Sequence, residues 1–316
     1  MTPLRVASLV EGRLAGSSIS ARPGPFSFRR GGAIAIAMTF IIVGIITPAL
    51  STALATTLAC ALLLVVGLPH GALDIATLRR AGPTAQLPVV GAYLGAAAVM
   101  FAIWWASPLT GLAVFYTVSM VHFGDDWGND RDPLFGRANA LALLSAPAVL
   151  HGKHLAGLFV VLTRDPRSAV LVDLLMLVAP VATCFALVGL ATMASRQRSV
   201  EGLCALLAMF ILPPVIGFAL FFCLFHSPRH FREGWATLGP KADPGTSVRV
   251  AAMTLAGFGI AAVIYAVIAR PNLSAGVFAT SILTLSVLTV PHMLLQGIVA
   301  VGNRPAGSRQ RGSLAA

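Results

Sequence analysis

Stretches of about 20 apolar residues recur along the chain, and each is long enough to cross a lipid bilayer as a helix. Runs such as Leu54–Leu68 do not alternate between apolar and polar residues, which argues against the strands of an outer-membrane β-barrel. The candidate spans are residues 32–50, 51–78, 87–106, 109–127, 138–162, 169–193, 200–227, 249–269 and 275–300. The sequence therefore predicts an all-α, polytopic integral membrane protein with about eight or nine transmembrane helices.

Charged residues are too scarce to cover a soluble domain of this size. They make up 10% of the 316 residues, and hydrophobic residues make up 57%. Soluble domains carry about 25% charged residues. The net charge of +11 comes mostly from arginines in the tails and short loops, so it does not indicate nucleic-acid binding. Arginines that precede residue 32 place the N-terminus in the cytoplasm. We expect a multi-pass protein of the plasma membrane whose surroundings are the lipid bilayer.

The two ends of the chain differ in composition from the apolar part between them. Residues 1–31 are rich in Gly, Pro, Ser and Arg and have no apolar period, so we expect a disordered basic segment. Residues 302–316 read as a disordered tail. Residues 32–301 are predicted to form one membrane-embedded helical catalytic domain. The four cysteines lie in apolar runs without a CxxC pair, and we expect them to be buried small hydrophobic residues.

Histidines are the ionisable side chains that lie inside or at the ends of the apolar segments. Ionisable groups in a membrane are costly and usually functional. His226 and His230 are four residues apart, so they share one face of a helix and can bind one metal ion. Pro228 between them requires local accommodation, because a proline ring disturbs the helical turn before it. A pair of loop histidines at a helix end is the alternative for this motif.

Two further histidines have a carboxylate within one helical turn. Asp74 follows His70 by four residues, and Asp125 and Asp126 follow His122 by three and four. A metal-bound imidazole usually donates its other N–H group to a carboxylate, which fixes the tautomer and orientation of the ring. Solvated aspartates at helix ends are the alternative. We expect His70 to lie near the middle of the bilayer, where helices of either direction can bring the four histidines together.

The remaining histidines are less informative. We favour a helix interface for His151 and His154, although a proton path or support of the metal ligands would also fit them. His292 fits the wall of a cavity and a satisfied buried histidine equally well.

Four imidazoles restrict the metal chemistry without selecting one metal. Imidazole nitrogen suits Fe, Cu, Zn and Ni. Structural zinc sites normally use thiolates, and the chain has no HExxH motif of a zinc protease. Non-enzymatic alternatives remain, because histidines in helices also ligate haem in b-type cytochromes and form proton or ion paths in transporters.

Four blocks of the sequence contain the histidines discussed above, except for His151 and His154. The blocks are Gly67-Leu68-Pro69-His70-Gly71-Ala72-Leu73-Asp74, Val121-His122-Phe123-Gly124-Asp125-Asp126, Phe225-His226-Ser227-Pro228-Arg229-His230 and Pro291-His292-Met293-Leu294. Together they resemble the signature blocks of the Brp/Blh family of bacterial β-carotene 15,15′-dioxygenases. The resemblance runs from about residue 60 to residue 300, with the blocks in the same order. One departure is the Asp125–Asp126 pair, where many relatives are expected to have Glu at one position; the negative charge is kept.

The resemblance implies a non-haem Fe(II) cofactor and cleavage of the central double bond of β-carotene by O₂, giving two molecules of retinal. It implies His70, His122, His226 and His230 as the catalytic iron ligands. The aspartates expected to support these ligands are Asp74, Asp125 and Asp126. The side chains expected to line the substrate site are Phe123, Trp127, Phe222, Phe225, His292 and Met293. Core packing is the alternative for each of these aromatic residues. A retinal-binding rhodopsin is a candidate protein partner.

Overall fold

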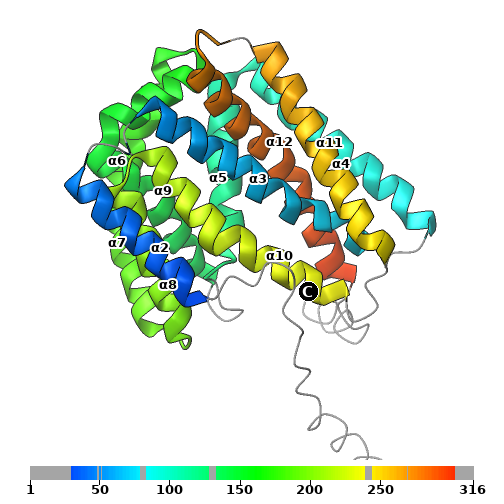
Figure 1. Cartoon of the computed structure of the whole chain (residues 1–316), viewed down its shortest axis with the longest axis horizontal. Helices are drawn as coiled ribbons and strands as arrows, with labels where there is room; N and C mark the ends of the chain where they lie inside the picture. The colour runs from blue at the N-terminus through cyan, green and yellow to red at the C-terminus, as the bar shows by residue number, and fades with distance from the viewer. Residues whose placement is uncertain are drawn as a thin grey trace, which may run out of the picture.

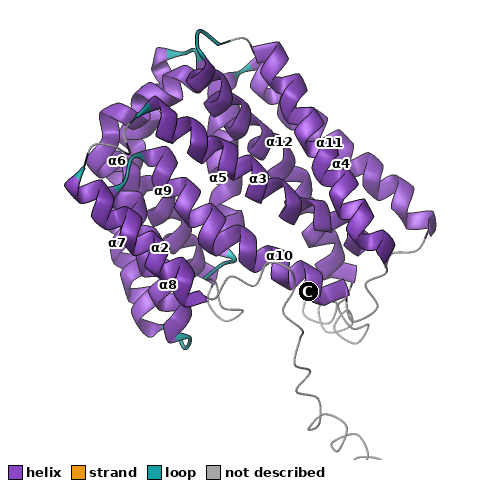
Figure 2. Cartoon of the chain, viewed as in Figure 1, coloured by secondary structure: helices purple, strands orange, loops and turns teal. Residues whose placement is uncertain are grey.

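The computed structural model describes residues 30–47, 50, 52–78, 83–127, 133–238, 244–268 and 270–302, and every regular element within these ranges is a helix (Figure 2). The all-α class predicted from the apolar runs is therefore confirmed. The two segments expected to be disordered lie almost entirely outside the described residues.

Each of the nine predicted apolar segments falls on helical structure. The helices are α2 (Arg30–Ile46), α3 (Ala53–Leu78), α4 (Pro83–Ala106), α5 (Pro108–Gly124), α6 (Pro133–Thr163), η3 (Pro166–Ala169), α7 (Val170–Thr192), α8 (Arg196–Ile211), α9 (Pro214–Leu220), η4 (Phe221–His226), α10 (Ser227–Leu238), α11 (Pro244–Ile268) and α12 (Leu273–Gly302). The junction between α4 and α5 is set by Ser107, whose side chain accepts a hydrogen bond from the Thr110 amide, and by Pro108 in the first turn.

Five helical segments in the described part of the chain are long and apolar enough to cross a membrane. They are Ala53–Leu73, Pro133–Thr163, Pro166–Thr192, Gly245–Ile268 and Leu273–Met293, and three shorter apolar helices accompany them. Large apolar side chains also lie on the outer surface, such as Leu177 and Trp105, which are 74% and 72% exposed. Such a surface suits lipid better than water. The count of eight or nine spans stays a prediction.

The segment predicted as one span over residues 200–227 is two helices instead. Helix α8 ends at Ile211, and Pro213 and Pro214 start α9. A residue before proline avoids the helical conformation, and proline itself has no N–H group to continue a helix, so the two prolines break the run. From Pro214 the chain then stays helical through α9, η4 and α10 as far as Leu238, which is eleven residues beyond the predicted end.

Helices α3, α5 and α12 lie in the middle of the bundle, with α2 and α6–α9 on one side and α4 and α11 on the other (Figure 1). Helix α3 packs against α12, α11, α10 and α9, while α5 packs against α6, α4 and α12. The Trp104 indole N–H donates a buried hydrogen bond of 2.8 Å to Ser286, which ties α4 to α12. Because α3 packs against α10 and α12, and α12 packs against α5, the four sequence blocks can meet.

Candidate metal centre

Four histidine rings from distant parts of the sequence meet inside the bundle. His122 comes from α5, His226 and His230 from the η4–α10 junction, and His292 from α12. The His122 ring centroid lies 4.8 Å from that of His226, 5.5 Å from that of His230 and 5.1 Å from that of His292. The ring centroids of His226 and His230 are 4.5 Å apart. The structure therefore brings together three of the four expected ligands and adds His292 to them.

Asp126 lies between the two histidines of the HxxxH motif and is itself 3% exposed. Its Oδ2 atom is 2.7 Å from His226 Nδ1, and its Oδ1 atom is 3.0 Å from His230 Nε2. A carboxylate can only accept, so each of these ring nitrogens carries a proton and donates. With these tautomers, a metal ion bound to the two rings would be held through the opposite nitrogens, Nε2 of His226 and Nδ1 of His230. Asp126, His226 and His230 offer possible ligand atoms that all lie within 4.8 Å of one another.

Three neighbouring donor groups favour the ionised form of Asp126. His226 and His230 both donate hydrogen bonds to its carboxylate. The Arg229 guanidinium also donates to the Asp126 carbonyl oxygen at 2.8 Å and lies 3.4 Å from its Oδ1 atom. An ionised Asp126 can accept from both rings at once, as a group that orients metal ligands must.

Arg229 also binds a second buried carboxylate that sequence reasoning missed. Its Nη2 atom donates to Glu201 Oε2 at 2.7 Å, and its guanidinium carbon lies 5.9 Å from the Trp127 ring centroid. Glu201 is 8% exposed and also accepts from Gln197, one turn before it on α8. It is the one acidic residue in the apolar segment 200–227, a signal that could have drawn attention to it. Two carboxylates and one guanidinium leave one negative charge in this group, which a bound cation would offset.

The turn after α5 directs Asp126 inward and leaves Asp125 exposed. The Asp126 amide bonds to the Phe123 carbonyl oxygen at 3.2 Å, and the Trp127 amide bonds to that of Gly124 at 3.4 Å, so the chain winds tightly. A Cβ atom on Gly124 would lie 3.3 Å from the Arg137 backbone nitrogen, so glycine lets the start of α6 approach closely. Of the two adjacent aspartates, Asp126 alone forms hydrogen bonds with the described histidines.

A π-helical segment, Phe221–His226, precedes Pro228. Proline cannot donate the helical hydrogen bond to the residue four before it, and its ring crowds that carbonyl group. The wider π turn relieves this conflict, and such turns are frequent at functional sites. The π-helical segment is thus the local change in the helix that the sequence predicted at Pro228.

Helix α3 packs against this segment close to His70. The Ser227 hydroxyl donates to the Val66 carbonyl oxygen at 2.8 Å. A Cβ atom on Gly67 would lie 2.9 Å from the Phe222 ring, so glycine allows the close approach. The backbone of His70 lies one turn further along α3, whereas the side chains of His70 and Asp74 are outside the described residues. The ligand role of His70 stays a prediction.

An apolar cavity of about 340 Å³ adjoins the histidine rings. His122, His292, Phe123 and Phe222 form the wall nearest the metal centre, and Leu68, Tyr93, Leu94, Met253 and Leu285 are among the rest of its lining. The other three side chains expected at the substrate, Trp127, Phe225 and Met293, are not among these lining residues. Trp127 stacks on Phe221 at 5.6 Å, and Phe225 is 4% exposed.

His151 lies away from this cluster, at a kink inside α6. Its Nε2 atom is 3.1 Å from the carbonyl oxygen of Ile211, at the end of α8. This contact supports the helix-interface interpretation for His151. His154 is exposed.

The cluster suits a divalent metal ion with nitrogen ligands. Buried imidazoles from three elements converge, a buried carboxylate orients two of them, and the surrounding carboxylates exceed the guanidinium by one charge. Imidazole is a preferred ligand of Fe(II) as well as of Cu and Zn.

Comparison with known proteins identifies relatives along most of the chain. Residues 61–299 match the family model described as beta-carotene 15,15′-dioxygenase. The beta-carotene 15,15′-dioxygenase of an uncultured marine bacterium, 66A03, is 29% identical, covering 79% of this chain and 95% of that protein. The probable beta-carotene 15,15′-dioxygenase Blh of Halobacterium salinarum is 27% identical, covering 83% of this chain and 88% of that protein. No solved structure matches.

Proposed function

Because this chain belongs to the β-carotene 15,15′-dioxygenase family and is a carotenoid-cleaving dioxygenase, we propose that it splits the central double bond of β-carotene with O₂ at a non-haem Fe(II) centre. The products are two molecules of retinal. The observation that carries the proposal is the convergence of buried imidazoles beside an apolar cavity.

We assign His122, His226 and His230 as iron ligands, together with His70. When bound, the iron supplies the activation of O₂ that carbon–carbon double-bond cleavage requires. Asp126 accepts a hydrogen bond from each of His226 and His230. These bonds fix the tautomer and orientation of each ring, with its other nitrogen facing away from the carboxylate. Arg229 holds Asp126 in turn. One oxygen atom ends in each aldehyde, so the overall reaction needs no net proton transfer and no general acid or base.

The cavity supports a hydrocarbon substrate. Its lining is mostly apolar, and the bundle that surrounds it has lipid-compatible outer surfaces, so β-carotene can pass from the bilayer without entering water. Phe123 and Phe222 contact the His226 ring at 4.8 and 5.2 Å between centroids. A polyene whose middle lies against these rings presents its central bond to the metal centre, while the apolar walls exclude water from the reaction.

The haem and transporter alternatives receive less support from the geometry. The ring centroids of His122 lie 4.8–5.5 Å from those of the other three histidines, and those of His226 and His230 are 4.5 Å apart, so a porphyrin plane does not fit within any of these four pairs. A proton path would require a polar route away from the histidines, whereas the adjoining cavity is apolar. A visible spectrum combined with metal analysis separates the three possibilities: the dioxygenase has stoichiometric iron and no haem bands.

For the whole chain we retain eight or nine spans in the plasma membrane, with the N-terminus in the cytoplasm. A retinal-binding rhodopsin is the protein partner that the proposed product suggests.

The reaction is tested by expression in a β-carotene-producing bacterium. We expect the cells to bleach and retinal to be the one major product, with no bleaching in cells that make His226→Ala. Two unequal aldehydes would contradict central cleavage. Unchanged colour in an oxygenated culture, with the protein folded and iron-loaded, would contradict β-carotene as the substrate.

A further inference from the structure

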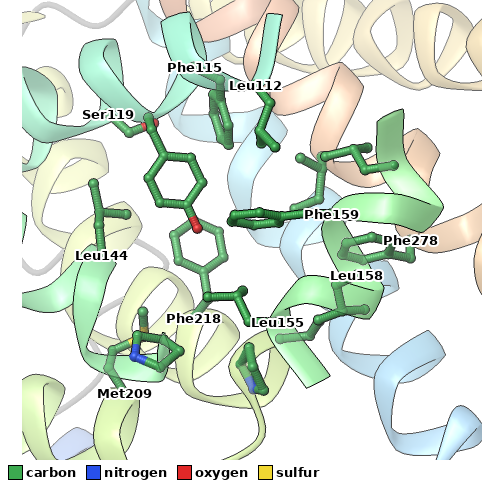
Figure 3. A pocket seen from close by; sticks show the side chains of 16 residues that line it. Leu112, Phe115, Ser119, Leu144, Leu155, Leu158, Phe159, Met209, Phe218 and Phe278 are labelled. Carbon is green, nitrogen blue, oxygen red and sulfur yellow. The ribbon is translucent and has the colours of Figure 1, made fainter. Parts of the chain in front are cut away.

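A second, smaller cavity lies beside the first, and side chains from α5, α6, α8, α9 and α12 converge on it (Figure 3). Its volume is about 70 Å³, against about 340 Å³ for the cavity at the histidines. Phe115 and Phe218 belong to the walls of both cavities. These two rings are therefore the partition between them.

The lining of the small cavity is almost entirely hydrocarbon. Leu112, Leu155 and Phe159 are 1%, 5% and 4% exposed, so they lie inside the bundle. The hydroxyl groups in the wall belong to Ser119 and Tyr116. Water needs about 10–15 Å³ by this measure and two to four polar partners. The cavity has room for several small molecules but too few polar groups to hold a chain of waters.

Aromatic rings separate this cavity from the metal centre. The Phe218 ring centroid lies 6.0 Å from that of Phe123 and 5.7 Å from that of Phe222. Both of these rings contact His226. Rotation of Phe218 would open an apolar route from the small cavity into the larger one, whose wall includes His122 and His292.

We propose that the small cavity binds molecular oxygen and supplies it to the metal centre past Phe218. The inference rests on the proposed use of O₂ as co-substrate. Oxygen is small and apolar, so it partitions into dry hydrocarbon cavities as xenon does. The carotenoid occupies the larger cavity. Oxygen bound in the small cavity can then approach the histidines from the side that the polyene does not cover.

Xenon is the probe for the cavity itself, because it binds apolar cavities whether or not the protein is catalytically active. Crystals of the iron-loaded protein under xenon pressure should show xenon among Leu112, Leu155 and Phe159. Leu155→Phe should abolish this xenon site, whereas Leu150→Phe on the exposed side of the same helix should keep it. Ordered water in the cavity, or no xenon, would overturn the proposal even if retinal production is normal.

Oxygen kinetics test the supply role. Leu155→Phe should raise the KM for O₂ at least several-fold while the KM for β-carotene stays unchanged, and Leu150→Phe should leave both at the wild-type values. If Leu155→Phe does not fold, Leu158→Ala, which enlarges the cavity, should change the KM for O₂ alone. A rise in the KM for β-carotene instead would assign the cavity to one end of the carotenoid and overturn the proposal. If the protein makes no retinal at all, the proposed function fails, while the xenon result still decides the cavity.

Discussion

At the scale of single residues, Asp126 makes the two histidines of the HxxxH motif chemically different. It accepts from Nδ1 of His226 and from Nε2 of His230, so the two rings hold opposite tautomers. Iron would be bound through Nε2 of one ring and Nδ1 of the other. The motif is therefore asymmetric although its sequence looks symmetric, and one carboxylate decides the orientation of both rings.

We expect Asp126→Asn to weaken Fe(II) binding by about 10–100-fold, the usual effect of removing a group that orients metal ligands. The amide keeps one acceptor and turns a donor toward the other ring, so one ring must rotate or change tautomer. Competition with a chelator measures the affinity. Asp125→Asn is the matched control, because Asp125 is exposed and should keep the wild-type affinity. Equal losses in both variants would show that Asp126 has no special role.

Arg229 supports a second prediction at this scale. In Arg229→Met the carboxylates of Asp126 and Glu201 both lose their cation, which costs roughly 3 kcal/mol when a partly buried pair loses one member. The apparent Tm in detergent should fall, whereas Arg232→Met on the same helix should change it little. Adding Glu201→Gln to Arg229→Met should restore part of the loss, because one uncompensated charge is removed. An unchanged Tm in Arg229→Met would mean that this ion pair does not stabilise the fold.

At the scale of helices and turns, prolines and glycines place the site residues. The π-helical turn before Pro228 orients His226, while Gly67 and Gly124 allow α3 and α6 to approach the elements that carry the site. These residues form no bond to a ligand. They act by setting how closely the elements approach and how each element is rotated.

Gly67→Ala tests the approach of α3 to η4. The added Cβ atom would lie 2.9 Å from the Phe222 ring, so the ring must shift toward the cavity or the helices must separate. We expect a lower kcat/KM for β-carotene with iron content retained, measured in detergent with purified protein. Gly95→Ala on α4, where a Cβ atom meets nothing within 4 Å, should behave as wild type. A wild-type rate in Gly67→Ala would show that Phe222 does not shape the substrate site.

The elements also show how much the sequence could predict. The long apolar runs predicted the all-helical class correctly, because the length and composition of such runs identify helices. The break at Leu212–Pro213 was missed because the apolar run continues across it, and the extension to Leu238 was missed because α10 carries Arg229, Arg232 and Glu233 and has no apolar run. His292 and Glu201 could not be placed by spacing, since their partners are distant in sequence. Asp126 could be grouped with His122, but its contacts with His226 and His230 depend on tertiary packing.

At the scale of the whole molecule, bound metal should contribute to stability. A ligand that binds only the folded state stabilises it by an amount that grows with the logarithm of the ratio of ligand concentration to Kd, about 2.7 kcal/mol at 100 times Kd. Chelation should therefore lower the apparent Tm, and Fe(II) added back should restore it. His226→Ala should have the lower Tm from the start and should not respond to the chelator. A chelator-insensitive wild-type protein, shown by metal analysis to have lost its iron, would contradict a stabilising metal centre.

The junction at His226 has a consequence for how the enzyme is assembled. The chain from Pro214 to His226 is apolar, while the next turns carry Arg229, Arg232 and Glu233. The two histidines of the motif thus lie where an apolar helix is followed by a charged one, which favours a depth nearer the membrane surface than the mid-bilayer position expected from the sequence. If α10 lies at the aqueous face, a metal ion would reach the site from the aqueous phase, and a hydrocarbon substrate would reach it by lateral diffusion in the bilayer. In liposomes with the protein in both orientations, external Fe(II) should load only the molecules whose α10 faces outward.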